Sequence, residues 1–333
     1  MKRAILLLWL CFLQFNSIAQ SSNAYKEAAG NSMKTGDYEN AILILKKGLE
    51  ITPHHIELKK MLSFCYYFQN DFDKSSKILK KIIKIDSADA ECYQILGEIY
   101  SLKNKIKESE ILYRIGITKF PSDGNMYNQL AGILWEKKNE EAIIYWEKGI
   151  KADPNYSKNY YNACNYYYLK NNFIWSLIYG ELFVNLESYT SKTEEIKLII
   201  FNAYKKINEI SFPSLVEKYQ HPFELAYINN LYNQDITRPA VINFSSLMML
   251  RTRFVLNWFD NTNNKFPYKL FNFHQQLLRE GLFESYNQWL IGTVDSASHQ
   301  HWLWNHQDEY NTFISMQKLK LFKLPDNQYY YHQ

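Results

Sequence analysis

Four histidines lie between residues 274 and 306, and imidazole is the side chain best suited to metal binding and proton transfer near neutral pH. They are His274, His299, His301 and His306, with the carboxylates of Glu280, Glu284, Asp308 and Glu309 nearby. A spacing of seven residues puts His299 and His306 two turns apart on one helical face, too far apart to share one metal ion, and His301 points elsewhere. The sequence has no His-Glu-x-x-His motif and no paired cysteine ligands. We therefore predict polar or half-buried histidines, no metal site and no cofactor.

Large aromatic residues surround these histidines: Trp258, Trp289, Trp302, Trp304, Phe271, Phe273 and Phe283. Such rings can form a platform on which a carbohydrate or peptide stacks, but they more often form the core of a small helical bundle, which is the interpretation we favour. The chain also lacks a nucleophile motif and a glycine-rich phosphate loop. We therefore predict that the protein is not an enzyme. Catalysis in the histidine-rich region and binding of carbohydrate or cell wall are the alternatives.

The composition favours a folded, helical chain without affinity for nucleic acid. Of the 333 residues, 47% are hydrophobic and 22% are charged, which is typical of a globular protein. Glycine (11) and proline (8) are scarce, which favours long helices over a turn-rich β-sandwich. The net charge of +4 is small and is not concentrated on one segment, whereas a nucleic-acid binder needs a basic face.

The first 19 residues have the pattern of a secretory signal. Lys2 and Arg3 precede the apolar run Ala4–Phe15, and Ser17-Ile18-Ala19 supplies the small residues that signal peptidase requires. We expect export to the periplasm or cell envelope, or secretion, with Gln20 as the first mature residue. An uncleaved membrane anchor is the alternative, although the apolar run is shorter than the roughly 20 residues of a bilayer span. No later segment is apolar enough to span a membrane.

A repeat of about 34 residues organises the first half of the chain. One column of small residues runs through Ala29, Ser63, Gly97, Ala131 and Cys164, and a second runs through Ala41, Ser75, Ser109, Ala142 and Ser176. In the first unit, apolar spacing predicts a helix ending at Lys34, a turn at Thr35-Gly36-Asp37 and a second helix over Tyr38–Ile51. A single hairpin of this kind cannot bury its own apolar face, so the units must stack.

These columns resemble the tetratricopeptide repeat family. Its motif is matched by Tyr93-x-x-Leu96-Gly97-x-x-Tyr100 with Pro121, and by Gly36-Asp37-Tyr38-x-x-Ala41 with Pro53. The resemblance covers about five units between residues 22 and 190, with a degenerate helix over Lys192–Ile207. It implies an all-α fold in which helical hairpins form a right-handed superhelix, or solenoid, with the first helix of each hairpin lining a concave groove.

By the same resemblance, the groove holds a peptide or protein partner, and rigid aromatic rings on its surface suit that role. The predicted partner-binding residues are Lys26, Lys60, Phe64, Tyr67, Phe68, Gln94, Glu98, Asn128, Trp135, Lys158, Tyr161, Asn165 and Tyr168. Phe64, Tyr67 and Phe68 form the strongest cluster. Family members that clamp a terminal carboxylate use lysine and asparagine one turn apart, but here Gly30 follows Lys26 and Phe64 follows Lys60, so that clamp is absent.

Regular stacking also places Cys65 and Cys92 about 10 Å apart along the stack, beyond the roughly 7 Å that a disulfide allows between Cα atoms. We predict that both remain reduced.

The repeat register is lost after residue 207, so we expect three parts: a signal at 1–19, repeats at 20–207 and a compact helical bundle at 208–333. In the bundle we expect a mostly buried helix over Ala240–Asp260, a helix from Pro267 to Gly281, a helix over Leu282–Ile291 and one over Ala297–Leu319. The predicted function is a non-enzymatic scaffold acting after export. Its partner is a protein or peptide of the cell envelope, without nucleic acid, a small-molecule ligand or a membrane span in the mature chain.

Overall fold

The computed structural model describes residues 22–85, 88–232, 238–319 and 322–325, so the expected signal at 1–19 lies outside the described residues. Throughout these ranges the regular structure is helical and no β-strand occurs, which confirms the all-α prediction. The chain forms two compact units, Met1–Pro121 and Ser122–Gln333, called unit 1 and unit 2 below. This division falls inside the repeats, and the boundary expected at 207/208 stays a prediction.

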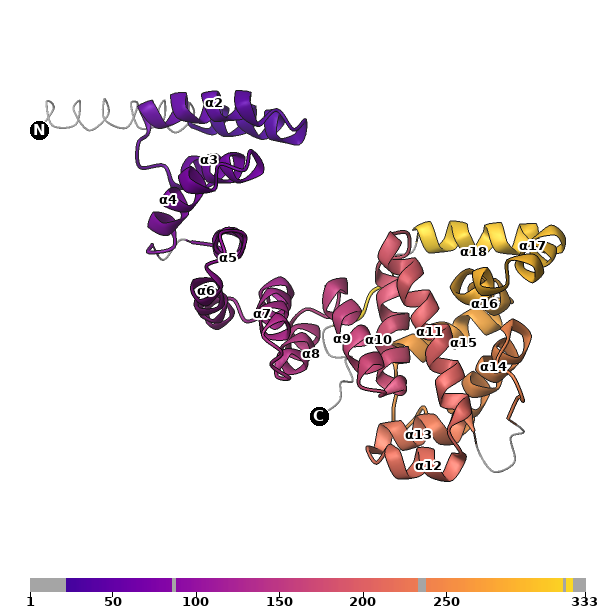
Figure 1. Cartoon of the computed structure of the whole chain (residues 1–333). Helices are drawn as coiled ribbons and strands as arrows, with labels where there is room; N and C mark the ends of the chain where they lie inside the picture. Colours follow the sequence, from indigo (N-terminus) through magenta and orange to yellow (C-terminus); the bar gives the residue numbers. More distant parts are fainter. Residues whose placement is uncertain (1–21, 86–87, 233–237, 320–321, 326–333) are drawn as a thin grey trace, which may run out of the picture. The chain divides into compact units, whose positions relative to one another are not determined.

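Unit 1 consists of helical hairpins, drawn from indigo to purple in Figure 1. Residues 22–34 are helical and pair with α2, and the elements that follow are α2 (Tyr38–Ile51), α3 (Ile56–Phe68), α4 (Phe72–Ile82), α5 (Ala90–Leu102) and α6 (Ile106–Lys119). The helix to residue 34 and the helix over Tyr38–Ile51 match the sequence prediction.

The small-residue columns are the contact surfaces inside each hairpin. Ala41, Ser75, Ser109, Ala142 and Ser176 are all fully buried. The Ser109 hydroxyl donates to the Gly97 carbonyl over 2.8 Å, and a Cβ added at Gly97 would lie 2.5 Å from Cζ of Tyr113. A larger residue in either column would therefore force the two helices apart.

The turn inside each hairpin depends on one residue in the left-handed backbone region. Gly36 has φ +76°, and Asn70, Asn104, Lys138 and Asn171 have φ between 57° and 61°. These positions recur with the repeat period. Glycine and asparagine tolerate this conformation, whereas lysine does not favour it. Of these five residues, Lys138 is therefore the one whose side chain is least compatible with a positive φ.

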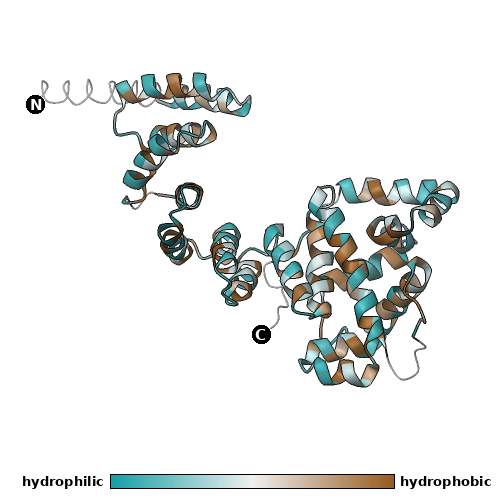
Figure 2. Ribbon diagram, in the orientation of Figure 1, coloured by the Kyte–Doolittle hydropathy of each residue, from teal (hydrophilic) through white to brown (hydrophobic). Residues whose placement is uncertain are grey.

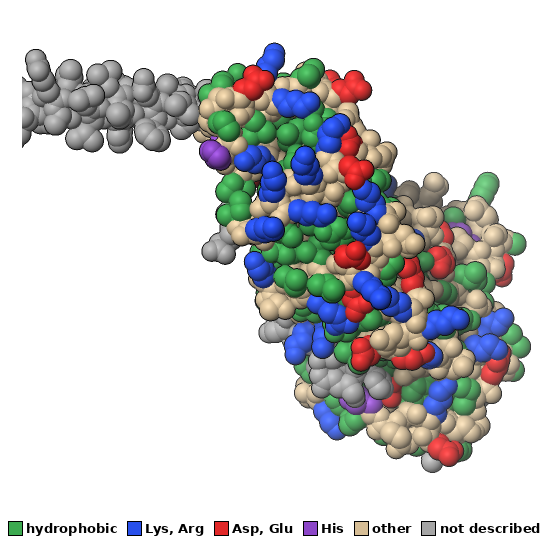
Figure 3. All heavy atoms as spheres, turned by 60° about the vertical axis from the view of Figure 1, so that its left-hand side comes forward, with side chains coloured by type: hydrophobic (Ala, Val, Ile, Leu, Met, Phe, Trp, Pro, Cys, Tyr) green, Lys and Arg blue, Asp and Glu red, His purple; other side chains and the backbone are tan. Residues whose placement is uncertain are grey.

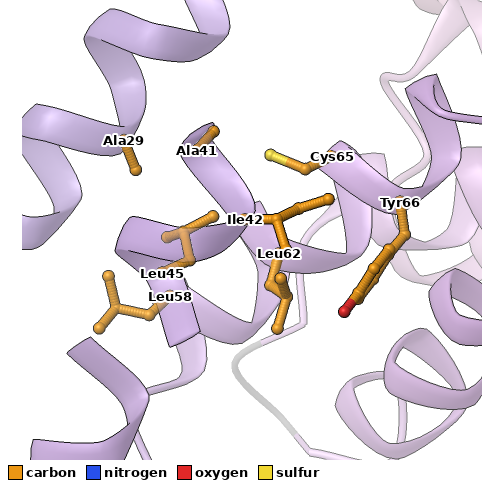
Figure 4. Close-up of a cluster of buried hydrophobic side chains, with 8 residues drawn as sticks. All are labelled: Ala29, Ala41, Ile42, Leu45, Leu58, Leu62, Cys65 and Tyr66. Carbon is orange, nitrogen blue, oxygen red and sulfur yellow. The ribbon is translucent and has the colours of Figure 1, made fainter. Parts of the chain in front are cut away.

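A hydrophobic cluster joins the first two hairpins of unit 1 (Figure 4). Its members come from helix 22–34, α2 and α3: Ala29, Ala41, Ile42, Leu45, Leu58, Leu62, Cys65 and Tyr66. In unit 1, the hairpin helices carry apolar residues on one side and polar residues on the other, so one side packs inward and the other stays hydrophilic (Figure 2). The cluster therefore buries apolar surface that a single hairpin would leave exposed to solvent.

Unit 2 continues the hairpins and adds the C-terminal helices. The hairpin helices are α7 (Gly124–Glu136), α8 (Ala142–Ala152), α9 (Ser157–Leu169) and α10 (Phe173–Leu186), followed by α11 (Ser191–Glu209) where the degenerate helix was predicted. The remaining elements are α12 (Phe212–Lys218), α13 (Pro222–Leu231), α14 (Phe244–Asn261), α15 (Lys269–Arg279), α16 (Phe283–Ile291), the 3-10 turn η1 (Gly292–Asp295), α17 (Ser296–Asn305) and α18 (Gln307–Leu319).

Helix α10 is the centre of unit 2. Its sequence is apolar on every side, and every residue from Phe173 to Asn185 is buried. Trp175 stacks on Phe223 of α13 with ring centroids 5.4 Å apart. A Cβ at Gly180 would lie 3.0 Å from Sγ of Cys164 in α9 and 3.1 Å from Cγ1 of Ile200 in α11. The C-terminal helices therefore pack directly on the last hairpin.

One predicted helix is wrong. The sequence favours a single helix over Ala297–Leu319, but α17 ends at Asn305 and α18 begins at Gln307. His306, with φ −130° and ψ 31°, leaves the helical region, and its ring stacks on Trp302 with centroids 4.6 Å apart. The Asp295 side chain caps α17 by accepting from the Ser298 amide. Across the described residues, no helix has the length and apolarity that a membrane span requires.

Candidate partner-binding face

The first helices of unit 1 carry a chain of alternating charges, which we call the charged row: Lys26, Glu57, Lys60 and Asp89. The Lys26 ammonium lies 4.0 Å from Glu57, while the Lys60 ammonium lies 3.4 Å from Glu57 and 2.7 Å from Asp89. Burial lowers the pKa of Lys60, but the Asp89 and Glu57 carboxylates outweigh burial and raise it. Burial, with Asp89 and Glu57 nearby, raises the pKa of Glu91 at the same face.

The predicted aromatic cluster of α3 is only partly available to a partner. Phe64 is 5% exposed and lies beneath Lys60, whose ammonium is 5.8 Å from the ring centroid. Phe68 is 52% exposed and stacks on Tyr38 at 5.0 Å. The Tyr67 hydroxyl hydrogen-bonds the Glu98 carboxylate of α5, and burial together with this bond raises the Tyr67 pKa. Phe64 is therefore buried beneath the predicted face, and Phe68 is an apolar side chain exposed on that face.

Gln94 of α5 is half-buried, and its backbone carbonyl accepts from the Tyr113 hydroxyl over 3.4 Å. Together with Glu98 it continues the predicted face from α3 onto the next first helix of unit 1.

In unit 2 the predicted residues also meet across neighbouring first helices. Asn162 of α9 donates from its side-chain amide to Oδ1 of Asn128 of α7 over 2.7 Å. Tyr161 donates to Glu195 of α11 over 2.9 Å, and Asn165 donates to the Tyr161 carbonyl. Burial and the Glu195 carboxylate raise the pKa of Tyr161 to about 12. Asn162 was not predicted, although its spacing of 34 residues from Asn128 is a signal that could have identified it.

Lys158, Trp135 and Tyr168 are also predicted face residues of unit 2, and they differ in exposure and in their contacts. Lys158 is exposed. Trp135 is 37% exposed and meets Tyr166 edge to face at 5.6 Å, while Tyr168 meets Phe173 edge to face at 5.8 Å. Trp135 is therefore partly exposed, and Tyr168 contacts the next helix, α10.

The histidines of the histidine-rich region do not lie together in the structure. His274 is buried beside Glu181, His299 meets Oε1 of Gln288 at 2.7 Å, and His306 stacks on Trp302. His301 is exposed. Among the residues that the structure describes, no three His, Cys, Asp or Glu side chains are grouped to hold a metal ion. The expected aromatic core is confirmed for Trp258, Trp289, Phe271 and Phe283, but Trp304 is 87% exposed.

A buried polar cluster, which the sequence analysis did not predict, connects α10 with the C-terminal helices. Arg251 of α14 pairs with the Glu181 carboxylate and donates to Tyr204 of α11 over 2.9 Å. His274 Nε2 lies 2.8 Å from Glu181, and Tyr286 donates to the same carboxylate over 2.8 Å. Burial raises the pKa of Glu181, but Arg251 and His274 outweigh it and hold that pKa well below its usual range.

Cys65 and Cys92 are free, as predicted, and all three described cysteines, Cys164 included, are free and buried. Lysine and arginine side chains on the face drawn in Figure 3 are interspersed with hydrophobic and acidic ones rather than gathered in one basic patch.

Stacked antiparallel hairpins with small-residue contact columns define the chain as an α-helical repeat protein. A model of the tetratricopeptide repeat matches residues 32–99. Residues 32–99 therefore contain tetratricopeptide repeats, and the hairpins that follow have the same helical-hairpin architecture.

The solved structure of PilF agrees with this fold. PilF of Pseudomonas aeruginosa is similar with a TM-score of 0.51 and 16% identity, covering 62% of this chain and 96% of PilF. PilW, described as a widely conserved type IV pilus biogenesis factor, has a TM-score of 0.47 and 15% identity, covering 62% of this chain and 97% of PilW. At such identities the likeness concerns the fold alone.

Human aspartyl/asparaginyl beta-hydroxylase is 26% identical over 119 residues, which is 35% of this chain and 16% of the hydroxylase. The mouse protein of the same name gives the same identity and coverage. The chain thus spans 16% of the length of these curated relatives, and so partial a match does not establish their enzymatic activity for it.

Proposed function

We propose that this protein is a non-enzymatic scaffold that acts after export and binds an extended peptide, or an extended segment of a partner protein, on the first helices of its repeats. The observation that carries the proposal is a set of polar contacts between neighbouring first helices, each of which includes at least one predicted residue. Lys60 reaches Asp89, and Tyr67 reaches Glu98, so polar groups form a row along unit 1. An extended peptide presents its amides and carbonyls at a regular spacing, which such a row can meet.

Binding requires the partner to displace some of these internal pairs, and their energies permit it. The Lys60 side chain is 16% exposed, but those of Glu57 and Asp89 are 37% and 46% exposed, so solvent reaches both pairs and they are closer to surface ion pairs than to buried ones. Surface ion pairs contribute about 0.2–1 kcal/mol each. Phe68 adds an exposed ring that stacks on Tyr38 and needs little ordering on binding. The face can therefore exchange internal contacts for partner contacts at small cost.

The location is part of the proposal. The charged start, short apolar run and small residues of the first 19 positions support export to the periplasm or cell envelope, or secretion. Amino-terminal sequencing of the protein recovered from the cell envelope or medium tests this point. A chain that begins at Gln20 supports it, and a chain that keeps Met1 and remains in the cytoplasm contradicts it.

The binding face is tested by replacing Phe68 with a photo-crosslinking amino acid in the native cell. The matched control is Leu43 of α2, the second helix of its hairpin. The Leu43 side chain is 59% exposed, close to the 52% of Phe68. We expect a discrete adduct from position 68 and none from position 43, with the partner identified by mass spectrometry. Equal adducts from both positions, or none from position 68, would contradict the proposed face.

A further inference from the structure

Unit 2 contains a cavity of about 390 Å³ that is unrelated to the first-helix face. Its walls come from the end of α10, from α15, from the end of α18 and from segment 322–325. A volume of several hundred cubic ångströms is in the range of small-molecule sites. Neither the repeat pattern nor the histidine-rich region accounts for this cavity.

Segment 322–325 is held in place as one wall of the cavity. The side chain of Asn155 donates to the Leu324 carbonyl over 2.8 Å and accepts from the Leu324 amide over 2.9 Å. The Leu324 side chain is 3% exposed. Phe322 meets Phe273 of α15 edge to face with centroids 5.4 Å apart. A two-bond backbone contact and a packed ring fix this wall at a defined position.

Among the described residues that line the cavity, the charged ones are Lys269 of α15 and Lys323, and none of these described residues carries a carboxylate. Neither lysine forms an ion pair with another described residue. Two unpaired ammonium groups at one cavity favour an anion.

Uncharged donors in the wall strengthen this preference. The Gln317 side chain is oriented by Tyr189, whose hydroxyl donates to Oε1 of Gln317 over 2.8 Å. That bond leaves Nε2 of Gln317 buried and without a hydrogen-bond partner among the described residues. A buried N–H donor normally has an acceptor, so the free donor indicates a missing acceptor group. The apolar part of the wall is formed by Phe273, Met316 and Phe322.

We propose that this cavity binds a small amphipathic carboxylate, an organic acid whose carboxylate is held by Lys269, Lys323 and Gln317 and whose apolar part lies against Phe273, Met316 and Phe322. The cations and the free amide supply the donors that a carboxylate accepts from. The aromatic and thioether side chains supply the apolar surface.

Isothermal titration of the full chain with octanoate tests the proposal, with octanol as the uncharged ligand of equal chain length. We expect octanoate to bind at least about tenfold more tightly than octanol, because charge-assisted hydrogen bonds are the stronger class. Lys269→Gln and Lys323→Gln should each weaken octanoate binding about tenfold and leave octanol binding unchanged. The control is Lys318→Gln, an exposed lysine of α18 outside the cavity wall, which should bind octanoate as the unchanged protein does.

A second variant keeps the test decisive if a lysine variant folds poorly. Gln317→Met removes the amide donor and retains the length of the side chain, and it should also weaken octanoate selectively. The circular dichroism spectrum and melting temperature of each variant confirm that the fold is retained. Absence of octanoate binding to the full chain at millimolar concentration overturns the proposal. Equal affinities for octanoate and octanol, or equal losses in the Lys318→Gln control, overturn it as well.

Discussion

Glu181 of α10 and Arg251 of α14 form an ion pair from which solvent is excluded, with the two residues separated by 70 positions in the chain. Arg251 Nη1 donates to Oε2 of Glu181 over 3.0 Å, and its Nε donates to Oδ1 of Asn287 over 2.5 Å. A buried charge is tolerated only with such partners, because desolvation of an unpaired charge costs several kcal/mol. This pair therefore ties the last hairpin to the C-terminal helices.

Removing one partner of this pair should destabilise unit 2 strongly. Arg251→Met leaves the Glu181 carboxylate buried without its cation, and we expect the free energy of unfolding to fall by about 3–5 kcal/mol. Denaturation in guanidinium, followed by tryptophan fluorescence, measures the change. The double variant Glu181→Gln/Arg251→Met should recover most of the loss, because no charge remains buried. Lys206→Met, which breaks the exposed pair with Glu209, is the control and should leave the transition nearly unchanged.

The pH dependence of stability should follow the same cluster. Burial lowers the pKa of His274 below its usual value, with Glu181 opposing and Arg251 adding to the shift. The unfolded chain therefore binds a proton near pH 6.5 that the folded chain does not bind until a lower pH, so stability falls as the pH drops from 7.5 to 5. Because the pKa of Glu181 is depressed, its contribution is present above about pH 4.3 and is lost below it.

His274→Gln should make the unfolding free energy less dependent on pH between 7.5 and 5, as measured by urea titrations at fixed pH. His299, whose pKa burial and Lys197 also lower, keeps part of the slope in this variant. The exposed His301 provides the control, and His301→Gln should preserve the slope of the unchanged protein. An identical slope in the His274→Gln and His301→Gln variants would rule out this role for His274.

Arg251 and His274 show why the polar cluster could not be predicted from the sequence. Arg251 interrupts an apolar run, which indicates a buried arginine in need of a partner, but nothing in local spacing points to Glu181. His274 was grouped with histidines near it in sequence, although its partner lies on α10. The helical hairpins were predictable because their small-residue contacts recur at a fixed period. The cluster depends on how α14 and α15 pack on α10, and that packing has no period.

The repeating positions of the candidate face were predictable for the same reason, and their role in partner binding stays a prediction. Asn128, Tyr161 and Lys60 occupy repeating positions, and the structure places each beside a residue of the next first helix. Their exposure was not predictable, because it depends on how closely neighbouring helices approach. Phe64 and Phe68 lie one turn apart on α3, yet they are 5% and 52% exposed.

The three thiols of the described chain should be unreactive while the protein is folded. Burial raises the pKa of Cys65 to about 11 and the pKa values of Cys92 and Cys164 to about 12. The thiolate is the reactive form, so neither disulfide exchange nor alkylation should proceed at pH 8. A colorimetric thiol assay should detect no reaction in buffer and three thiols per mature chain in 6 M guanidinium. Rapid reaction of a thiol in buffer would show that a repeat opens locally.

Replacing Lys138 with glycine should stabilise the fourth hairpin. Lys138 has φ +58°, a conformation that costs a side-chain-bearing residue about 1 kcal/mol and glycine very little. We expect Lys138→Gly to raise the free energy of unfolding by about 0.5–1 kcal/mol in thermal or urea denaturation. Lys137→Gly is the matched control, because Lys137 has φ −77° and glycine there only increases the freedom of the unfolded chain. A loss of stability in Lys138→Gly would contradict the argument.

Two fragments should differ in solubility, because α10 is buried by the C-terminal helices and only one fragment retains them. A fragment of residues 20–207 loses α13 and α14, which exposes Trp175 where Phe223 covers it and leaves Glu181 without Arg251. We expect this fragment to aggregate. A fragment of residues 122–333 retains every contact of the compact unit 2 and should remain soluble and helical. Size-exclusion chromatography and circular dichroism separate these outcomes. A monomeric, helical 20–207 fragment would instead support the expected boundary at 207/208 and assign the C-terminal helices a role other than covering α10.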